Sequence, residues 1–222
     1  MGEEIDVIDD YIKNVKFGAN MTFGPNGIGG WFGNNYGCPL TDTGSYISDP
    51  NKKTYHAFDE SLAYGLGKFF ISNGYKSIGD FGCGWSGYYT KYLRKMGLEC
   101  FGYDGDHMTK STAYCTWVDL TRSDFGFPIH DFLFTLETAE HIPKLYESTF
   151  IENCDASNRH GIVVSWSNGI GHGHVNCRNS YDIKDIFFEL GYKCDSEGTM
   201  MISKEVTAPW VRERSSVYVF RK

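Results

Sequence analysis

Between residues 77 and 221, short apolar runs alternate with segments whose apolar residues recur at helical spacing. The apolar runs predict seven strands, at residues 77–81, 99–103, 117–120, 132–136, 161–166, 192–197 and 216–221. Helical spacing predicts helices at 87–96, 145–154 and 180–190. This alternation is typical of a doubly wound α/β fold, a mostly parallel seven-stranded sheet with helices on both faces.

The last two predicted strands differ from the others because no clear helix pattern separates them. The segment between them contains Pro209 and is predicted to be a loop. We therefore expect these two strands to pair antiparallel at one edge of the sheet.

The first 52 residues lie outside this alternation. Apolar residues at helical spacing predict a short helix over residues 5–15, and a stretch rich in Gly, Asn and aromatic residues follows it. A further helix is predicted over 53–73, ended by Gly74. We expect one domain over residues 1–222, with 1–52 as an N-terminal helix and lid or substrate-binding extension and 53–222 as the core. The aromatic residues of the lid are Phe23, Trp31, Phe32 and Tyr36.

Composition and charge narrow the classes of partner. The formal net charge is −7, which disfavours extended binding to nucleic acid and suits a small or neutral molecule. Seven scattered cysteines without a CxxC pair indicate free thiols in a reducing compartment. The acidic N-terminus lacks the parts of a signal peptide, and no apolar run is long enough to span a bilayer. We expect a cytoplasmic protein; its oligomeric state stays open.

A glycine turn follows the strand at 77–81. Asp80 ends the apolar run, and Gly82, Gly84 and Gly87 follow with the spacing G-x-G-x-x-G. Such a turn between a strand and a helix is a generic nucleotide cradle. A carboxylate at this place repels a pyrophosphate by roughly 4 kcal/mol at 4 Å and an effective dielectric of 20, and attracts a cation equally. S-adenosylmethionine carries an ammonium, a sulfonium and no phosphate, so Asp80 favours this cofactor over a dinucleotide.

The stretch from Asp80 to Gly87 resembles the first motif, D/E-x-G-x-G-x-x-G, of the class I S-adenosylmethionine-dependent methyltransferases, of the small stand-alone type. The segments GYDGD (102–106), WVDLT (117–121) and FLFTLETAEHIP (132–143) resemble the following elements of that family. The resemblance implies that Asp104 accepts from both ribose hydroxyls, that Asp119 accepts from the adenine amino group and that Leu120 packs beside the adenine. The implied cofactor-binding residues are Asp80, Gly82, Cys83, Gly84, Gly87, Asp104, Gly105, Asp106, Asp119, Leu120 and Glu137.

Two loops on the cofactor side of the predicted sheet carry candidate catalytic residues. Transfer of a methyl group to a hydroxyl requires a base near the methyl group. His141 follows the strand at 132–136 and is our first candidate, with Glu140 to orient it. His172 and His174 follow the strand at 161–166, and we expect them to share the role or to bind the acceptor. Asn176, Arg178 and the lid residue Trp31 are predicted to bind the substrate, whereas His56, His130 and His160 are read as structural.

The sequence leaves the metal requirement open. Glu140, His141, His172 and His174 are ligand types that suit a divalent ion. However, the sequence contains no HxxxH or paired-carboxylate spacing among them.

The acceptor is narrowed by missing motifs. No Asn/Asp-Pro-Pro-Tyr/Phe motif follows the strand at 132–136, which disfavours methylation of DNA amino groups. No Pro-Cys pair occurs there either, which disfavours methylation of cytosine C5. We expect O-methylation of a sugar or glycan hydroxyl. The alternatives are a methyltransferase acting on protein or RNA, an NAD-dependent oxidoreductase, and a non-catalytic module that binds the cofactor.

Overall fold

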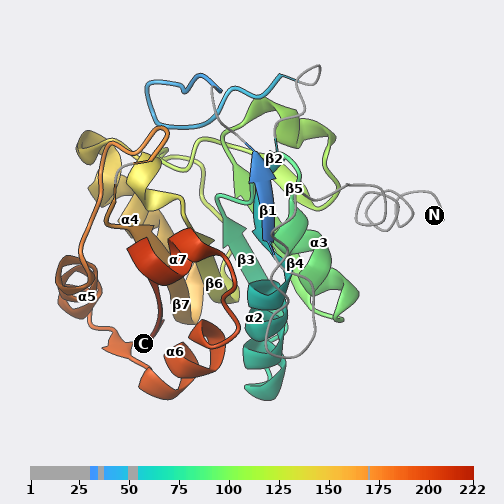
Figure 1. Ribbon diagram of the computed structural model, residues 1–222, viewed down its shortest axis with the longest axis vertical. Coiled ribbons are helices and arrows are strands. Elements are labelled where there is room, and N and C mark those ends of the chain that lie inside the picture. Colours follow the sequence, from blue (N-terminus) through green and yellow to red (C-terminus); the bar gives the residue numbers. More distant parts are fainter. Residues whose placement is uncertain (1–30, 35–37, 50–54, 170) are drawn as a thin grey trace.

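The computed structural model describes residues 31–34, 38–49, 55–169 and 171–222, without the side chains of 31–34, 55 and 213–216. Its main feature is a seven-stranded sheet of order β5-β4-β3-β6-β7-β9-β8 (Figure 1). Every neighbouring pair from β5 to β7 is parallel, and β9 runs antiparallel to both β7 and β8. The strands are β3 (Ser77–Phe81), β4 (Glu99–Asp104), β5 (Cys115–Trp117), β6 (His130–Leu136), β7 (Asn158–Ser167), β8 (Lys193–Cys194) and β9 (Ser215–Arg221).

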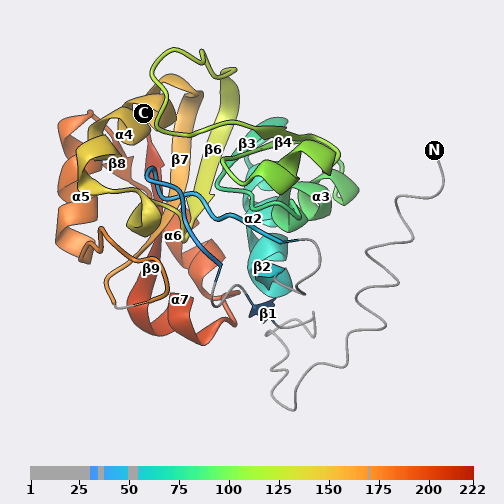
Figure 2. The same cartoon turned by 90° about the horizontal axis from the view of Figure 1, so that it is seen from above.

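Helices cover both faces of this sheet (Figure 2). One face carries α2 (Glu60–Ser72), α3 (Tyr88–Lys95), α6 (Ser196–Ser203) and α7 (Pro209–Arg214); the other carries α4 (Glu147–Ala156) and α5 (Ser180–Glu189). Alternate residues of β6 point to opposite faces, so that Phe132 and Phe134 pack into the first core and Leu133 into the second. The doubly wound α/β fold predicted from the sequence is confirmed.

One prediction about the start of the core needs correction. The helix predicted over 53–73 begins only at Glu60, because Tyr55–Asp59 forms β2, which pairs antiparallel with β1 (Trp31–Asn34) in a separate two-stranded sheet. Asp59 sets the boundary, since its backbone is extended and its side chain accepts a hydrogen bond from the Leu62 N–H as an N-cap. The helix predicted over residues 5–15 lies outside the described residues.

The segment between β8 and β9 is also corrected, because it contains α6 and α7 instead of a loop. Asp195 caps α6 by accepting from the Gly198 N–H, and Pro209 begins α7, a position that suits its fixed φ. The predicted antiparallel pairing of the last two strands at one edge of the sheet is confirmed, with β8 as the edge strand and β9 between β7 and β8. The predicted strand at 117–120 is shifted, since β5 covers Cys115–Trp117.

The strand order places a topological switch point between β3 and β6, which lie side by side although β4 and β5 intervene in the sequence. In open α/β sheets, ligands bind beyond the carboxyl ends of the strands at such a point. Here the turn after β3 and the loop after β6, with its 3₁₀ turns η2 (Ala139–His141) and η3 (Lys144–Tyr146), meet at this edge. A third 3₁₀ turn, η1 (His107–Ser111), follows β4. None of the described helices combines the length and apolar character needed to cross a membrane.

Candidate functional site

The glycine turn after β3 is packed so closely that side chains do not fit in it. Gly82 and Gly84 have φ values of +86° and +64°, a conformation that favours glycine. A Cβ added at Gly82 would lie 2.0 Å from Thr138 Oγ1, and one at Gly84 would lie 2.5 Å from His56 Cγ. The turn therefore brings its backbone against the loop after β6 and against β2. Gly87, also left-handed, caps α3 at its N-terminus.

Asp104, at the end of β4, is tied to this turn. Its Oδ2 accepts a hydrogen bond from the Gly84 N–H over 2.8 Å, and its Oδ1 accepts from the Asp106 N–H over 2.7 Å. Burial raises the pKa of Asp104 above its ordinary value, and the nearby His56 and the two N–H donors oppose that rise. The carboxylate is thus held in one orientation, and it lines a cavity at this edge of the sheet.

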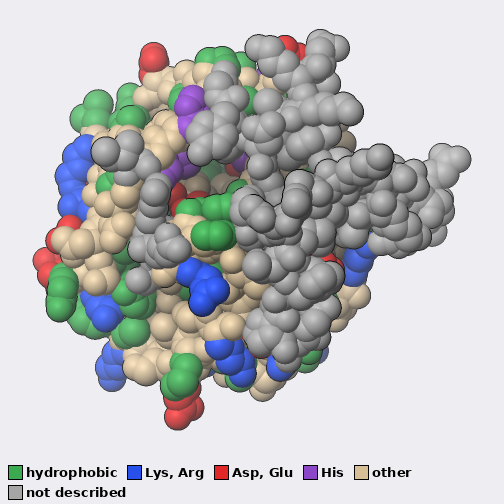
Figure 3. Space-filling view, viewed as in Figure 1, with side chains coloured by type: hydrophobic (Ala, Val, Ile, Leu, Met, Phe, Trp, Pro, Cys, Tyr) green, Lys and Arg blue, Asp and Glu red, His purple; other side chains and the backbone are tan. Residues whose placement is uncertain are grey.

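A cavity opens between the glycine turn and the loop after β6. It measures about 430 Å³ with its open mouth included, and Figure 3 shows histidine side chains gathered around a hollow on this face. Its lining joins the ends of β3, β4 and β6 to the segment 44–46 and to β2. The lining residues are Gly44, Ser45, Tyr46, His56, Gly82, Asp104, Gly105, Leu120, Glu137, Thr138, His141 and Ile142.

Asp80 lies behind the turn instead of lining the cavity. It is 2% exposed, and its Oδ2 accepts from Thr90 Oγ1 of α3 over 2.8 Å. Burial raises the pKa of Asp80 to about 8, although the hydrogen bond from Thr90 opposes this. The acid is therefore mostly protonated at neutral pH, and a cation bound at the turn would stabilise its charged form.

His141, which also lines the cavity, is held in one tautomer. Its Nδ1–H donates to the Gly173 carbonyl over 3.1 Å, which leaves Nε2 as the unprotonated nitrogen. Burial, followed by the proximity of His174, lowers the pKa of His141 to about 4. The imidazole is neutral at physiological pH, and a base with so low a pKa accepts protons only weakly there.

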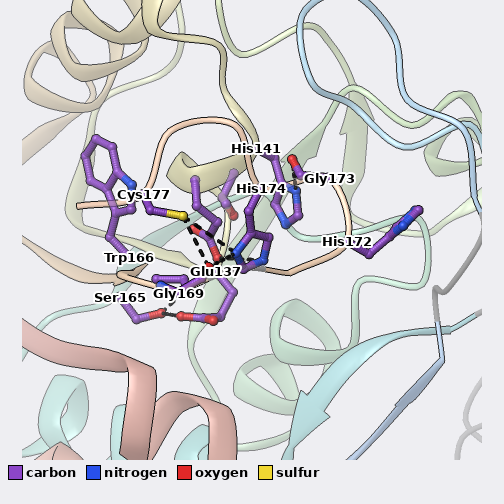
Figure 4. Close-up of polar contacts among 12 residues, drawn as sticks. Glu137, His141, Ser165, Trp166, Gly169, His172, Gly173, His174 and Cys177 are labelled. Carbon is purple, nitrogen blue, oxygen red and sulfur yellow. Dashed lines mark hydrogen bonds and ion pairs between the residues drawn. The ribbon is translucent and has the colours of Figure 1, made fainter. Parts of the chain in front are cut away.

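Glu140 and His174 complete this cluster. Glu140 is fully buried, and neither of its side-chain oxygens makes a hydrogen bond within the described part of the chain. Its Oε1 lies 4.0 Å from His174 Nε2, and the rings of His141 and His174 meet edge to face with centroids 5.0 Å apart (Figure 4). Burial, followed by the proximity of Glu137, holds the pKa of Glu140 well above its ordinary value.

The loop that carries His174 is anchored to Glu140 through the backbone. The N–H groups of Val175 and Asn176 both donate to the Glu140 carbonyl, over 2.9 and 3.0 Å. Glu137, which precedes this turn, has a φ of +51°, uncommon for a residue other than glycine. Ser165 holds it there, because its Oγ accepts from the Glu137 N–H and donates to Glu137 Oε1, both over 2.9 Å. A strained backbone at a cavity wall is typical of functional sites.

No protein-family model matches the chain, and no curated protein matches it by sequence. Solved structures do match. The magnesium protoporphyrin IX methyltransferase of Synechocystis, with bound S-adenosylhomocysteine, aligns with 72% of this chain and 81% of its own at 14% identity and a TM-score of 0.55. A TehB-like S-adenosylmethionine-dependent methyltransferase of Corynebacterium glutamicum aligns with 71% and 87% at 18% identity and a TM-score of 0.53.

A third match is the 1,6-didemethyltoxoflavin-N1-methyltransferase of Burkholderia thailandensis, with both 1,6-didemethyltoxoflavin and S-adenosylhomocysteine bound. It aligns with 73% of this chain and 78% of its own at 13% identity and a TM-score of 0.52. The fold is that of the class I methyltransferases. The resemblance deduced from the glycine turn is therefore confirmed at the level of the fold.

In this methyltransferase fold, the described segment 38–49 lies across the cavity. Tyr46 places its ring between three histidines, with centroids 5.1 Å from His141, 5.4 Å from His56 and 6.0 Å from His172. Its hydroxyl donates to the His172 carbonyl over 3.1 Å. Ser45 packs against Gly105 so closely that a Cβ added there would lie 1.9 Å from the Ser45 Oγ. This segment contributes Gly44, Ser45 and Tyr46 to the lining of the cavity.

Several predicted cofactor residues line the cavity of this methyltransferase fold, and others do not. Gly82, Asp104, Gly105, Leu120 and Glu137 line it. The remaining ones are not among the lining residues, and the cofactor role of both groups stays a prediction. Asp119 Oδ1 accepts hydrogen bonds from the Thr121 N–H and hydroxyl. The side chains of Cys83 and Asp106 are buried. Gly84, Gly87 and Asp80 support the turn as described above.

The acceptor-side predictions divide in the same way. His141 and His174 come together with Glu140, but His172 turns away and its Nε2–H donates to the Cys38 carbonyl over 2.8 Å (Figure 4). Asn176 and Arg178 both donate to the Glu147 carboxylate on α4 and do not line the cavity. The Trp31 side chain, Phe23 and Tyr36 lie outside the described residues.

His56 needs correction. The sequence assigned it a structural role, yet it lines the cavity beside Gly84, and its Nε2 lies 3.7 Å from Asp106 Oδ2. Tyr46 and Thr138 line the cavity as well and were not predicted. Tyr46 and His56 stand in no motif, because each reaches the site from an element whose position depends on the tertiary fold. Thr138 lies inside the segment 132–143 that resembles the family, but no role was assigned to it from the sequence.

Proposed function

We propose that the protein transfers the methyl group of S-adenosylmethionine to a hydroxyl of a sugar or glycan. One observation carries this proposal. Gly82 of the glycine turn and Asp104 line the same cavity as Glu137 and His141. A methyl donor held by the turn and Asp104 therefore shares the cavity with side chains that can accept a proton.

The cavity suits a cationic cofactor better than a dinucleotide. Its described lining contains two carboxylates, Asp104 and Glu137, and no Lys or Arg. A pyrophosphate would face these carboxylates without a counter-charge, whereas the sulfonium and ammonium groups of S-adenosylmethionine are attracted to them. In the proposal Asp104 accepts from the ribose hydroxyls, Leu120 packs beside the adenine, and the buried Asp80 favours the ammonium from behind the turn.

The reaction is an in-line displacement. The bond from the methyl carbon to the sulfonium sulfur breaks while a bond from the same carbon to the acceptor oxygen forms. The acceptor hydroxyl loses its proton to a basic side chain of the cluster of Glu137, Glu140, His141 and His174. The products are a methyl ether and S-adenosylhomocysteine. Alignment of the two reactants and exclusion of water by the segment 38–49 supply the rest of the acceleration.

The proposal of a sugar or glycan acceptor is based on this chain's own residues and not on the matched structures. The matched enzymes named for their substrates act on magnesium protoporphyrin IX and 1,6-didemethyltoxoflavin, and neither is a sugar. Support for a neutral acceptor comes from the net charge of −7 and from the absence of Lys and Arg in the described lining. As parts of the same proposal, the protein acts in the cytoplasm as one domain, with a core over 53–222 and an N-terminal extension that contributes to the acceptor site.

The test is to incubate the protein with S-adenosylmethionine that carries a labelled methyl group, together with separate pools of monosaccharides, glycans, RNA and protein. The proposal expects label in the sugar or glycan pool as a base-stable methyl ether. Label in RNA or protein alone would show that the proposed acceptor class is wrong, while the proposed methyl transfer would still hold. Binding of NAD without binding of S-adenosylhomocysteine would contradict the whole proposal.

A further inference from the structure

We infer that Glu140, His141 and His174 form a binding site for one divalent transition-metal ion. The three residues come from two loops, since Glu140 and His141 lie in η2 after β6 and His174 lies in the loop after β7. One ligand atom from each lies within 4.8 Å of the ligand atoms of the other two. Two imidazoles and one carboxylate thus converge on a point beside the proposed methyl-transfer site.

The strongest sign is the unsatisfied carboxylate of Glu140. This side chain is fully buried, and within the described residues both of its oxygens lack a hydrogen-bond donor. A buried carboxylate without a partner is costly, and in proteins such groups are paired with a cation or coordinate a metal. Nε2 of His174 lies 4.0 Å from Glu140 Oε1, too far for a hydrogen bond. An ion between them would satisfy the carboxylate.

The two imidazoles are oriented as metal ligands are. The Nδ1–H of His141 donates to the Gly173 carbonyl over 3.1 Å, and the Nδ1–H of His174 donates to the Gly169 carbonyl over 2.8 Å. In each ring the carbonyl fixes the tautomer, so that Nε2 is the unprotonated nitrogen. A hydrogen bond from the second ring nitrogen to a carbonyl is the usual outer partner of a metal-bound histidine.

The ligand set indicates the class of ion. Imidazole nitrogens suit later first-row transition metals such as Fe²⁺, Co²⁺ and Zn²⁺, whereas Mg²⁺ and Ca²⁺ prefer oxygen ligands. Three protein ligands leave coordination positions open, as in catalytic sites. His141 lines the cavity, so an open position faces the space assigned to the acceptor.

The role that we assign to the ion rests on the proposed function. A metal ion that binds the acceptor oxygen lowers the pKa of that hydroxyl and stabilises the oxygen as it attacks the methyl carbon. His141 then serves as a ligand instead of a base. The proton passes to Glu137, whose carboxylate lines the same cavity. Methyl transfer otherwise proceeds with the same bonds formed and broken.

Metal binding is tested without turnover. The purified chain is stripped with a chelator and titrated with Co²⁺, Mn²⁺ or Zn²⁺, with Mg²⁺ for comparison, by calorimetry and by the visible absorption of bound Co²⁺. We expect one ion per chain, tighter binding of the transition metals than of Mg²⁺, and Co²⁺ bands typical of nitrogen and oxygen ligands. Absence of binding, or a preference for Mg²⁺, would overturn the inference.

Matched variants locate the site. Glu140→Gln and His174→Ala are expected to weaken Co²⁺ binding by more than about tenfold. Loss of a residue that only hydrogen-bonds to a metal ligand typically costs at least that much, and these two variants remove ligands themselves. His172→Ala, two residues away on the same loop, is expected to retain it because His172 bonds to Cys38. Equal losses in His172→Ala and His174→Ala, or no loss in Glu140→Gln, would contradict the assignment.

Folding and cofactor binding are measured in parallel. Co²⁺ is expected to raise the melting temperature of the unmodified chain and not that of Glu140→Gln, whose near-identical shape keeps the fold comparable. An equal rise in both would overturn the assignment to Glu140. S-adenosylhomocysteine is titrated into the metal-free chain separately. Failure of that titration would count against the proposed function, whereas failure of the Co²⁺ titration would count against the metal site alone.

Discussion

The backbone N–H of Gly84 donates a hydrogen bond of 2.8 Å to Oδ2 of Asp104. This bond joins the glycine turn after β3 to the carboxylate at the end of β4. Because one donor is thereby fixed on one oxygen, the Asp104 carboxylate is oriented before a nucleoside arrives. Preorganisation of this kind reduces the entropy lost on binding.

Replacement of Asp104 by Asn is expected to weaken binding of S-adenosylhomocysteine by about 10- to 100-fold. An amide replaces a charged acceptor of hydrogen bonds, and such bonds contribute about 1.5–3 kcal/mol. Isothermal titration calorimetry measures the change. Asp124→Asn is the control, since Asp124 is exposed and lies outside the cavity. Unchanged affinity in Asp104→Asn would remove Asp104 from the cofactor site.

Gly82→Ala is expected to abolish detectable binding of S-adenosylhomocysteine. The new methyl group would lie 2.0 Å from Thr138 Oγ1, so the loop after β6 or the turn has to move. Gly74→Ala is a matched control: Gly74 is also left-handed, with a φ of +75°, but its added Cβ meets no atom within 4 Å. The control is expected to lose only stability, at a cost of about 1–2 kcal/mol. Equal cofactor affinity in the two variants would show that the close packing is irrelevant.

Asp80 is expected to make the stability of the chain fall as pH rises. Its folded pKa of about 8 lies above the ordinary value of 3.8, so the folded state holds a proton that the unfolded state releases. The resulting stability is present in full below about pH 4 and is lost as pH rises toward 8. Asp80→Asn removes this dependence. The melting temperature of Asp80→Asn minus that of the unmodified chain is expected to be larger at pH 8 than at pH 5. The same difference at both pH values would contradict the account.

The same group links cofactor binding to pH. If the ammonium of the cofactor stabilises the charged form of Asp80, binding releases a proton, and affinity for S-adenosylhomocysteine rises between pH 6 and pH 8. In Asp80→Asn this rise is expected to be absent. Calorimetry in two buffers with different ionisation enthalpies counts the protons released. Equal proton release by the unmodified chain and by Asp80→Asn would show that Asp80 does not ionise when S-adenosylhomocysteine binds.

Asp59 is expected to stabilise the fold far more than an ordinary cap. It accepts from the Leu62 N–H and also from Thr207 and the Ala208 N–H, which ties α2 to the segment before α7. Asp59→Ala is therefore expected to cost about 3 kcal/mol or more, since buried donors lose their acceptor. Asn179→Ala, at the cap of α5, is expected to cost only about 1 kcal/mol. Urea unfolding of both variants checks the order.

The fold was predictable because its signals are local. The apolar runs of β3, β6 and β7 and the glycine turn each lie within a few residues of sequence. The helices α6 and α7 were missed because they carry weak local signals. The α6 segment contains Gly198 and Thr199, and its stability comes from packing of Ile202 into the core beneath α2 and β9. The strand β2 was missed for a related reason, since its partner β1 is distant in sequence.

The site was predictable in part for the same reason. His141 and His174 follow neighbouring parallel strands, so their meeting follows from the predicted sheet. The direction of an individual side chain does not, and His172 points to Cys38 although it lies two residues from His174. Tyr46 and His56 reach the cavity from the N-terminal side, and only the tertiary fold brings them there.

The most direct test of the central claim is a pair of calorimetric titrations on the unmodified chain, one with S-adenosylhomocysteine and one with NAD. The account expects S-adenosylhomocysteine to bind at one site per chain and NAD to give no binding signal. Binding of NAD, or no binding of S-adenosylhomocysteine to the folded chain, would contradict it.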